Sequence, residues 1–399
     1  MLIEIILAIT IGILLGCITG LVPGVHINMV AVVTFSLSPI LLTYTSPLIL
    51  AIVIISMSIT HTFLDSLPSI FLGAPDEDHA LSVLPGHRLL LQGQGYQAVT
   101  LTTIGSLFAV IITALLVPLL IPISIKGYPL IQDYIPYLLI ISSLFLIGKE
   151  SKSRFWALTI FMLSGALGIA TLNLNLSQPL FPLFSGLFGT SILLLSLLEN
   201  TKIPKQVIEF PKVKKKELIK ALSSGFFASF LTGFLPGLGS AQAAIIGSSL
   251  YKKILPETFL ILTGSISTFV MAISFVALFS IDKARNGSVV IISKIMQSIT
   301  FDQLIIFMAV SMIVAGIATI LTLKLSKIFS RIMEKVNYKK LTISIIVLIA
   351  VLVLILTGPT GFLVLIVATF LGMLPSLKGI AKNHLMGSLL LPVILFFLL

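Results

Sequence analysis

The chain has 399 residues, of which 57% are hydrophobic and only 10% are charged. Its mean hydropathy is +1.17. A water-soluble protein of this length needs far more charged surface, so the composition excludes the soluble globular class. The formal charge of +11 lies mostly in short segments between apolar runs. Orientation in a bilayer explains that distribution, so the charge gives no reason to expect nucleic-acid binding.

The first apolar run begins at the N-terminus and predicts a membrane helix rather than a signal peptide. It carries Glu4 where a signal peptide has positive residues, and it leads directly into further apolar sequence. Runs of about 20 apolar residues then recur, each long enough to cross roughly 30 Å of hydrocarbon. Examples are Leu101–Leu120, Leu180–Leu198, Ile305–Leu323 and Leu341–Leu356. These runs predict an all-α, polytopic integral membrane protein.

The first run ends in a helix-breaking element that contains a Pro-Gly pair. Proline removes a backbone donor and glycine permits unusual dihedrals, so the helix is expected to break there. Non-helical backbone at membrane depth persists only where it lines a cavity or is buried in protein, and a new helix N-terminus suits an anion. We therefore expect substrate contacts here, with an ordinary turn between two spanning helices as the alternative; the residues are Thr19, Gly20, Pro23, Gly24, His26 and Asn28.

A second candidate region begins with ionisable residues inside an apolar segment. His61 and Asp65 are four residues apart, so they share one helix face, and intramembrane ionisable groups are usually functional. They are candidates for binding Na⁺ or relaying protons, and an internal hydrogen-bonded pair is the alternative. The following acidic run, with Asp76 and Asp78, is either a cation site or a solvated loop. Arg88 then offers a secondary contact to an anionic substrate.

Basic connections between the apolar runs predict the topology. By the positive-inside rule they are cytoplasmic in a multi-pass protein of the cell membrane. The nearly uncharged turns Thr171–Leu176 and Gly358–Gly361 should lie outside. The basic connections are Lys149–Arg154, Lys202–Lys216, Lys324–Lys340 and Lys378–Lys382.

Internal similarity predicts a duplicated chain. The element Thr19–Val25 recurs as Thr232–Leu238, and further matches follow at one constant offset. We therefore expect a first membrane repeat at 1–200, a basic and solvated cytoplasmic linker at 201–217, and a second repeat at 218–399; binding of anionic lipid headgroups is the alternative role for the linker. The further matches are Thr62-Phe63 with Thr268-Phe269, Ser82-Val83 with Ser288-Val289, and Gln97 with Gln303.

The loop charges indicate that the second repeat is inverted. The connection after Leu120 is poor in charge, whereas its counterpart after Leu323 is strongly basic. Equivalent loops on opposite sides require an odd number of crossings in each half, here about seven, or about five if the first pair is a re-entrant hairpin. Inverted repeats are the recurrent architecture of secondary transporters.

The second half supplies the matching site candidates. The repeated break contributes further substrate contacts, and a mixed-charge segment adds cations that suit an anionic substrate. The candidates at the break are Thr232, Gly233, Pro236, Gly237, Ser240 and Gln242, and those in the mixed-charge segment are Lys283 and Arg285. We find no Walker-type phosphate loop, metal-spaced histidine and cysteine array or nucleophile elbow, so no catalytic residue, cofactor or metal is expected.

Several of these elements resemble the large membrane subunit of tripartite tricarboxylate transporters, the TctA family. They are the Pro-Gly element, its second-half copy, and Gly73-x-Pro75 followed by Gly86 and Gly93-x-Gly95-x-x-Ala98. The resemblance implies an ion-coupled importer of carboxylates that works with a small membrane subunit and an extracytoplasmic binding protein. The chain departs from the family pattern at His26–Asn28, Asp76–Asp78 and Pro85–His87 and is shorter, which indicates a divergent branch able to work without those subunits.

A lipid substrate is the alternative to a carboxylate. A polyprenyl-phosphate carrier also offers an anionic group to helix N-termini, so a translocase could bind its phosphate at the same broken helices. The sequence leaves this choice, the coupling ion and a homodimeric assembly open. A non-transporting scaffold fits the composition but leaves the repeat unexplained.

Overall fold

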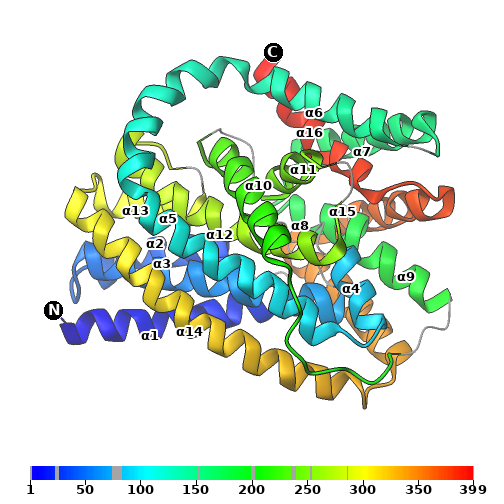
Figure 1. Cartoon of the computed structure of the whole chain (residues 1–399), viewed down its shortest axis with the longest axis horizontal. Coiled ribbons are helices and arrows are strands. Elements are labelled where there is room, and N and C mark those ends of the chain that lie inside the picture. The colour runs from blue at the N-terminus through cyan, green and yellow to red at the C-terminus, as the bar shows by residue number, and fades with distance from the viewer. Residues whose placement is uncertain are drawn as a thin grey trace.

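The computed structural model describes residues 2–22, 27–73, 83–150, 152–198, 203–234, 240–251, 254–284 and 286–398 (Figure 1). Throughout these ranges the regular elements are helices, and the described chain contains no strand. Eight of the described helices are long and apolar enough to cross a membrane. The prediction of an all-α, polytopic membrane protein is confirmed.

The first half alternates long and short helices. α1, α3 and α5 are long, whereas α2 and α4 are too short to cross roughly 30 Å of hydrocarbon alone. A π-helical turn extends α3, and a second one joins α8 to α9. The elements are α1 (Leu2–Leu21), α2 (Ile27–Leu41), α3 (Pro47–Leu64), η1 (Pro68–Leu72), α4 (Val83–Leu91), α5 (Gly95–Ile131), η2 (Gln132–Tyr134), α6 (Ile135–Lys149), α7 (Arg154–Asn173), α8 (Leu180–Phe184), η3 (Ser185–Thr190) and α9 (Ser191–Leu198).

The second half repeats this order of long and short helices. α15 corresponds to α6 and α7 together, because Gly358, with φ 69° and ψ −170°, interrupts its helical backbone. The recurrence is the arrangement that the predicted duplication requires. The elements are α10 (Lys215–Phe234), α11 (Ser240–Ser249), α12 (Pro256–Ile281), α13 (Gly287–Met296), α14 (Phe301–Met333), α15 (Tyr338–Lys378), η4 (Lys382–Met386) and α16 (Gly387–Leu398).

The helices α3 and α12 form the centre of the molecule, and nearly all of their residues are buried. Their neighbours approach closely because small residues face them, as is usual between membrane helices. A Cβ atom at Gly16 of α1 would lie 2.5 Å from Cβ of Thr60 on α3. Where the two halves meet, a Cβ atom at Gly264 of α12 would lie 2.3 Å from the carbonyl oxygen of Thr102 on α5.

The structure corrects the predicted register between the two central helices. Both begin at a proline, Pro47 and Pro256, and both are followed by a residue in the left-handed region, Gly73 and Asp282. Each of these pairs is 209 residues apart, whereas the match of Thr62 with Thr268 assumed 206. That match is therefore wrong by three residues.

A connection of different length explains the change in register. The path from Gly73 to Gly95, where α5 begins, is three residues longer than the path from Asp282 to Phe301, where α14 begins. A shift of three residues is close to one helical turn, so it leaves the apolar face nearly unchanged. Composition within the helices therefore could not reveal it.

The basic and the uncharged connections gather at different places. Lys378 lies over the ring of Trp156, with 4.2 Å between its Nζ and the ring centroid, which joins two basic connections. Ser177 donates a hydrogen bond to the carbonyl oxygen of Leu356, which joins the uncharged turn after α7 to the break in α15. The predicted topology requires this grouping; which end faces the cytoplasm stays a prediction.

The linker between the halves is docked rather than freely solvated. Residues 203–214 form no helix, yet the side chain of Gln206 is buried. Its Oε1 accepts a hydrogen bond from the backbone N–H of Gly95 at 3.0 Å, and its Nε2 donates to the carbonyl oxygen of Leu90 at 3.0 Å. Its own N–H donates to Oε1 of Glu334 at the end of α14. The prediction of a solvated linker is therefore wrong around Gln206, because these contacts attach the linker to both halves.

Candidate functional site

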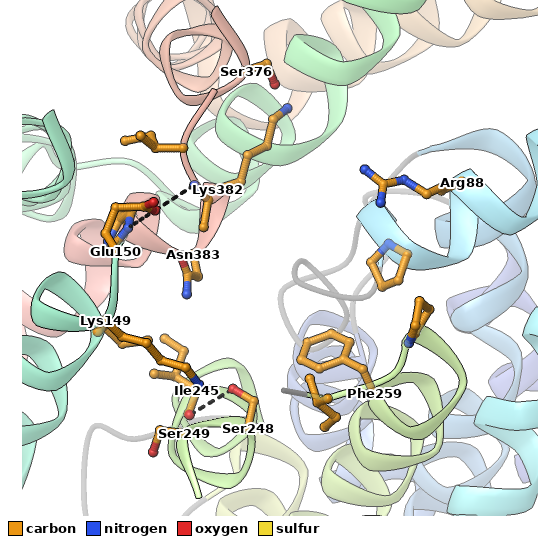
Figure 2. Close-up of a pocket in the computed structure, with 17 residues that line it drawn as sticks. Arg88, Lys149, Glu150, Ile245, Ser248, Ser249, Phe259, Ser376, Lys382 and Asn383 are labelled. Carbon is orange, nitrogen blue, oxygen red and sulfur yellow. Dashed lines mark hydrogen bonds and ion pairs between the residues drawn. The ribbon is translucent and has the colours of Figure 1, made fainter. Parts of the chain in front are cut away.

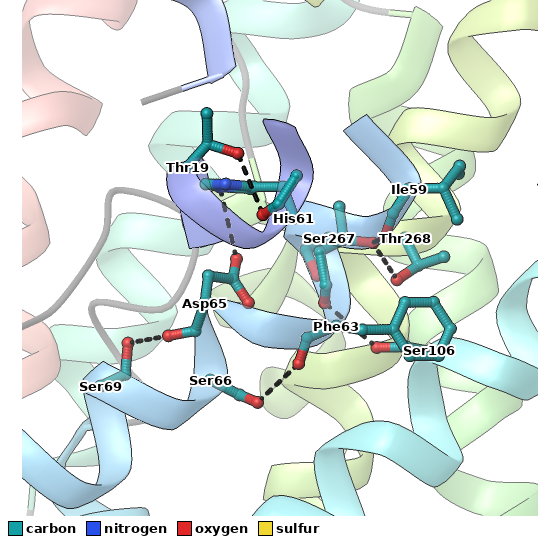
Figure 3. A network of polar contacts seen from close by, with 12 residues as sticks. Thr19, Ile59, His61, Phe63, Asp65, Ser66, Ser69, Ser106, Ser267 and Thr268 are labelled. Carbon is teal, nitrogen blue, oxygen red and sulfur yellow. Dashed lines mark hydrogen bonds and ion pairs between the residues drawn. The ribbon is translucent and has the colours of Figure 1, made fainter. Parts of the chain in front are cut away.

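The ionisable pair on α3 is the centre of the candidate site (Figure 3). Nε2 of His61 and Oδ2 of Asp65 are 3.8 Å apart, and both side chains are almost completely buried. Asp65 lies where α3 ends, and its carbonyl oxygen accepts a hydrogen bond from the hydroxyl of Ser69 in the π-helical turn. Burying ionisable groups at membrane depth is costly, and such groups usually have a function, so the pair is the leading candidate for the site.

The last turn of α1 lies directly beside this pair. Thr19 and Gly20 are both buried, and a Cβ atom at Gly20 would lie 3.3 Å from the carbonyl oxygen of His61 and from the backbone nitrogen of Asp65. The sequence analysis assigned Thr19 and Gly20 to the substrate and the ionisable pair to ion coupling. The structure brings these two predicted groups together just before the first helix break.

A contact between the two halves adjoins the same pair. Thr268 of α12 donates a hydrogen bond to the hydroxyl of Thr62 at 3.1 Å, and Thr62 is the neighbour of His61 (Figure 3). Ser106 of α5 donates to the carbonyl oxygen of Gly264 on α12 at 2.9 Å. Hydroxyl groups thus connect helices of different halves next to the ionisable groups.

The same helix carries buried hydroxyl groups that have spare hydrogen-bonding capacity. Within the described residues, the side-chain oxygens of Ser56, Ser58 and Thr60 are buried and have no hydrogen-bond partner. The corresponding Ser265 and Ser267 of α12 donate to carbonyl oxygens of their own helix. An unpaired buried hydroxyl costs about 1–3 kcal/mol. The hydroxyl groups at corresponding positions of the two central helices therefore differ in their hydrogen bonding.

The second broken helix has a less polar environment. Thr232, near the end of α10, is buried and donates to the carbonyl oxygen of Ala228 at 3.1 Å. A Cβ atom at Gly233 would lie 3.0 Å from Cγ2 of Ile273. Ser240, the first residue of α11, is buried. This end of α10 therefore meets an apolar part of α12, whereas the end of α1 meets the ionisable pair.

Several predicted site residues lie outside the described part of the chain. They are Pro23, Gly24, His26, Asp76, Asp78, Pro236, Gly237 and Arg285. The structure describes only the backbone of Asn28 in α2 and of Gln242 in α11. Their proposed contacts with substrate or ions stay predictions.

The two predicted cationic contacts, Arg88 and Lys283, do not share a site. Lys283 follows the C-terminal end of α12, and its Nζ donates to the hydroxyl of Tyr128 at 3.1 Å while lying 4.7 Å from that ring's centroid. Arg88 lies near the opposite end of α12, in a pocket that Pro256 also lines. A helix of the length of α12 extends about 39 Å, so the two cations lie far apart.

The pocket beside Arg88 was not predicted from the sequence (Figure 2). Its volume is about 840 Å³, and it lies among the ends of α4, α6, α11, α12 and α15 and the turn η4. Its cationic side chains are Arg88, Lys149 and Lys382, and Lys382 is only 5% exposed. The predicted topology places the connections after α6 and α15 on the same side of the membrane. That shared side is the one feature of the sequence from which the grouping of these residues could have been predicted.

A histidine–carboxylate pair at this pocket links the two halves. Oε2 of Glu150 is 3.2 Å from Nε2 of His384 and accepts a hydrogen bond from the backbone N–H of Ala381 at 3.1 Å. The backbone N–H of Lys152 donates to its other oxygen at 3.2 Å. Burial alone would raise the pKa of Glu150, but these hydrogen bonds and the histidine hold that pKa below its usual value.

Comparison with known proteins agrees with this architecture. The family model described as the tripartite tricarboxylate transporter TctA family matches residues 6–387. The uncharacterized protein MJ1079 of Methanocaldococcus jannaschii is 32% identical over 407 residues, covering 98% of this chain and 99% of that protein. No solved structure matches the chain. The chain therefore belongs to the TctA family, a family of membrane transporters rather than enzymes, whose members are the large membrane subunits of tripartite systems.

Proposed function

We propose that the chain is a secondary transporter that moves a small carboxylate by ion-coupled alternating access. The observation that carries the proposal is the position of the His61–Asp65 pair. It is buried on a membrane-spanning helix, next to the Thr62–Thr268 contact between the two halves. Ionisable groups at such a position mark ion or proton pathways in transporters.

The substrate site in this proposal lies between the two broken helices. α2 begins at Ile27 and α11 at Ser240, and each follows a Pro-Gly element in the sequence. The first N–H groups of a helix lack intrahelical partners, and its positive dipole end attracts an anion. A carboxylate between these ends would contact Thr19 and Gly20 from one half and Thr232 and Gly233 from the other.

Ion coupling then follows from the contact between α1 and α3. Because the end of α1 touches the backbone of His61 and Asp65, a proton or Na⁺ at that pair changes the charge beside the substrate. A bound carboxylate favours the added positive charge, and by linkage the cation favours the carboxylate equally. The corresponding contact in the second half, between Gly233 of α10 and Ile273 of α12, involves no ionisable side chain among the described residues.

Alternating access requires the two halves to move at their shared surface. Small residues and single hydroxyl contacts between α3, α5 and α12 contribute to that surface. Large apolar side chains also meet there, such as Phe71 and Phe329, whose ring centroids are 5.6 Å apart. An inverted repeat permits two states of similar energy by exchanging the conformations of its halves. Membership of the TctA family implies a small membrane subunit and a binding protein as partners, and the departures at His26–Asn28 and Asp76–Asp78 favour a branch that also transports alone.

Thermal unfolding of the purified chain in detergent tests the substrate class. We would add citrate or succinate, each with and without Na⁺ and at two pH values, and separately a polyprenyl phosphate. A ligand at about 100 times its dissociation constant stabilises the folded state by about 2.7 kcal/mol. Stabilisation by a carboxylate that increases with Na⁺ or with protons is expected.

Uptake into proteoliposomes that contain only this chain tests transport and partner dependence together. The carboxylate that stabilises the protein most is the probe, driven by a Na⁺ or pH gradient. Uptake that follows one gradient supports the proposal. Stabilisation by polyprenyl phosphate alone, without carboxylate uptake, would replace it by a lipid-carrier translocase that binds phosphate at the same helix ends.

A further inference from the structure

The pocket at η4 is separate from the site at the centre of the molecule. It is lined by Pro256 and Phe259 from the first turn of α12, whereas Thr268 marks the central contact. Nine residues of helix separate Phe259 from Thr268, which corresponds to about 14 Å. With a volume of about 840 Å³, the pocket has room for a small organic anion together with water.

The wall of the pocket contains buried polar atoms whose hydrogen bonds are not satisfied. Nζ of Lys382 and Oδ1 of Asn383 are buried and have no hydrogen-bond partner among the described residues. The Lys382 side chain is only 5% exposed. An unpaired buried ammonium group costs several kcal/mol, so proteins normally supply it with an anion. The described residues supply none, which points to a ligand at this position.

The charges around the pocket favour an anion over a cation. Arg88 projects from the wall opposite Lys382, as Figure 2 shows, and is solvent-exposed. Lys149 adds a third cation, whose Nζ donates to the carbonyl oxygen of Tyr251 at 2.6 Å. Among the described lining residues the one carboxylate is that of Glu150, and it already accepts hydrogen bonds from Ala381, Lys152 and His384. Among the described residues, no acidic side chain pairs with Lys382 or Arg88, and both residues line the pocket.

We infer that this pocket is a second anion-binding site, which takes a small polycarboxylate between Lys382 on one wall and Arg88 on the other. The presence of an anion site depends on the unsatisfied Lys382, and only the choice of a carboxylate rests on the proposed function. The pocket lies at the end of the molecule that holds the basic connections after α6 and α15. By the positive-inside rule that end is cytoplasmic, so the site would hold the solute as it leaves towards the cytoplasm.

Isothermal titration of the full chain in uncharged detergent with citrate tests the inference. Lys382→Met keeps most of the side-chain volume and removes the charge. Because a hydrogen bond to a charged group is lost, the affinity of this site should fall about 10- to 100-fold. Lys294→Met is the matched control, since it removes an exposed lysine of α13, beyond the C-terminal end of α12, and should leave citrate binding unchanged.

Stability without ligand separates ligand binding from a structural role. Removing an unpaired buried charge should leave the melting temperature of Lys382→Met unchanged or raise it, whereas a structural lysine would lower it. Arg88→Gln, on the exposed wall, is a second variant that folds without risk to the core and should also weaken citrate binding. Unchanged citrate binding in both Lys382→Met and Arg88→Gln would overturn the inference, as would an equal loss in Lys294→Met.

A variant of the central site keeps this result distinct from the proposed function. His61→Gln should lose citrate binding at the central site while keeping the citrate-binding event that depends on Lys382. If the central site does not bind citrate at all, the wild-type chain shows one event, which Lys382→Met removes and His61→Gln preserves. If the proposed function is correct but the second site does not exist, the wild-type chain binds citrate at the central site alone. That binding disappears in His61→Gln and persists in Lys382→Met.

Discussion

The central helices α3 and α12 occupy corresponding positions in the two halves but carry different chemistry. Both begin at a proline, both are almost completely buried, and both pack against a glycine-bearing helix of their own half. On the structural register, His61 and Asp65 of α3 correspond to Val270 and Ser274 of α12. The shared features maintain the packing of both helices. At the compared positions, only the first half carries an ionisable pair.

This difference shows how a duplicated scaffold can divide its tasks. Close packing needs small residues in both halves, so both retain them. A buried ionisable pair is costly, which agrees with its presence in one half only and with the role in ion coupling proposed for that half. We therefore expect substitutions on α3 to alter ion coupling and the corresponding substitutions on α12 to alter packing alone.

The largest expected effect is on transport by Asp65→Asn. The amide cannot carry the charge that binds a coupling cation, so ion-driven carboxylate uptake should fall about 10- to 100-fold, the equivalent of one lost charged hydrogen bond. Ser274→Ala, at the corresponding position of α12, should retain uptake. Initial rates in proteoliposomes compare the two variants. Equal losses in both would contradict the assignment of coupling to the first half.

A smaller effect on stability is expected at corresponding glycines of α1 and α10. A Cβ atom at Gly12 would lie 2.5 Å from the backbone oxygen of Val53, whereas one at Gly225 would lie 2.5 Å from the side-chain oxygen of Ser265. Backbone cannot rotate away but a hydroxyl can, so Gly12→Ala should destabilise by about 1–3 kcal/mol and Gly225→Ala by less. Thermal unfolding in detergent measures both. A larger cost at Gly225 would show that the two helix pairs are not packed as described.

The hydroxyl contact between the halves should contribute less. Thr62→Val and Thr268→Val each remove one partner of the 3.1 Å hydrogen bond while keeping the side-chain shape. Each should cost about 0.5–1.5 kcal/mol, and the double variant should cost less than the sum because the two residues share one bond. A double-mutant cycle of unfolding free energies provides the test, and strict additivity would exclude the contact.

The smallest effect is expected from the other histidine–carboxylate pair, Glu150 and His384, which provides a contrast to the buried pair on α3. The folded-state pKa of Glu150 is lowered, so its contribution to stability is present above the ordinary pKa of glutamate, about 4.3. That contribution is lost as the pH falls through the lowered value. Melting temperatures of the wild type and Glu150→Gln should therefore converge on acidification below about pH 4. A difference that stays constant with pH would mean that the carboxylate charge is irrelevant.

Much of the fold could be predicted from local sequence. The apolar runs predicted the membrane-spanning helices, and the first Pro-Gly element predicted the end of α1 at Leu21. The register of α3 against α12 was predicted wrongly, because a shift of about one turn preserves the apolar face. The linker was also misjudged at Gln206, because its charged neighbours hide a single buried amide.

Individual residues of the candidate site could be predicted from the sequence, but the contacts between them could not. Ionisable residues in an apolar run identified His61 and Asp65, yet nothing local placed Thr19 and Gly20 against them. From the sequence, Lys382 contributes only to the prediction of membrane topology. Its burial depends on the ends of α6 and α15, which lie beside it only in the folded chain. Residues that meet across the two halves share no local pattern that sequence periodicity could detect.

The sequence by itself determined the class of the protein, because hydrophobic length and charge distribution act segment by segment in a bilayer. It also predicted the repeated order of the helices, which depends on recurring motifs. Only the tertiary structure decided which helices touch, the register between the central pair and the unsatisfied charge at Lys382. These properties depend on close packing between distant segments, where a difference of one helical turn or one small residue changes every contact.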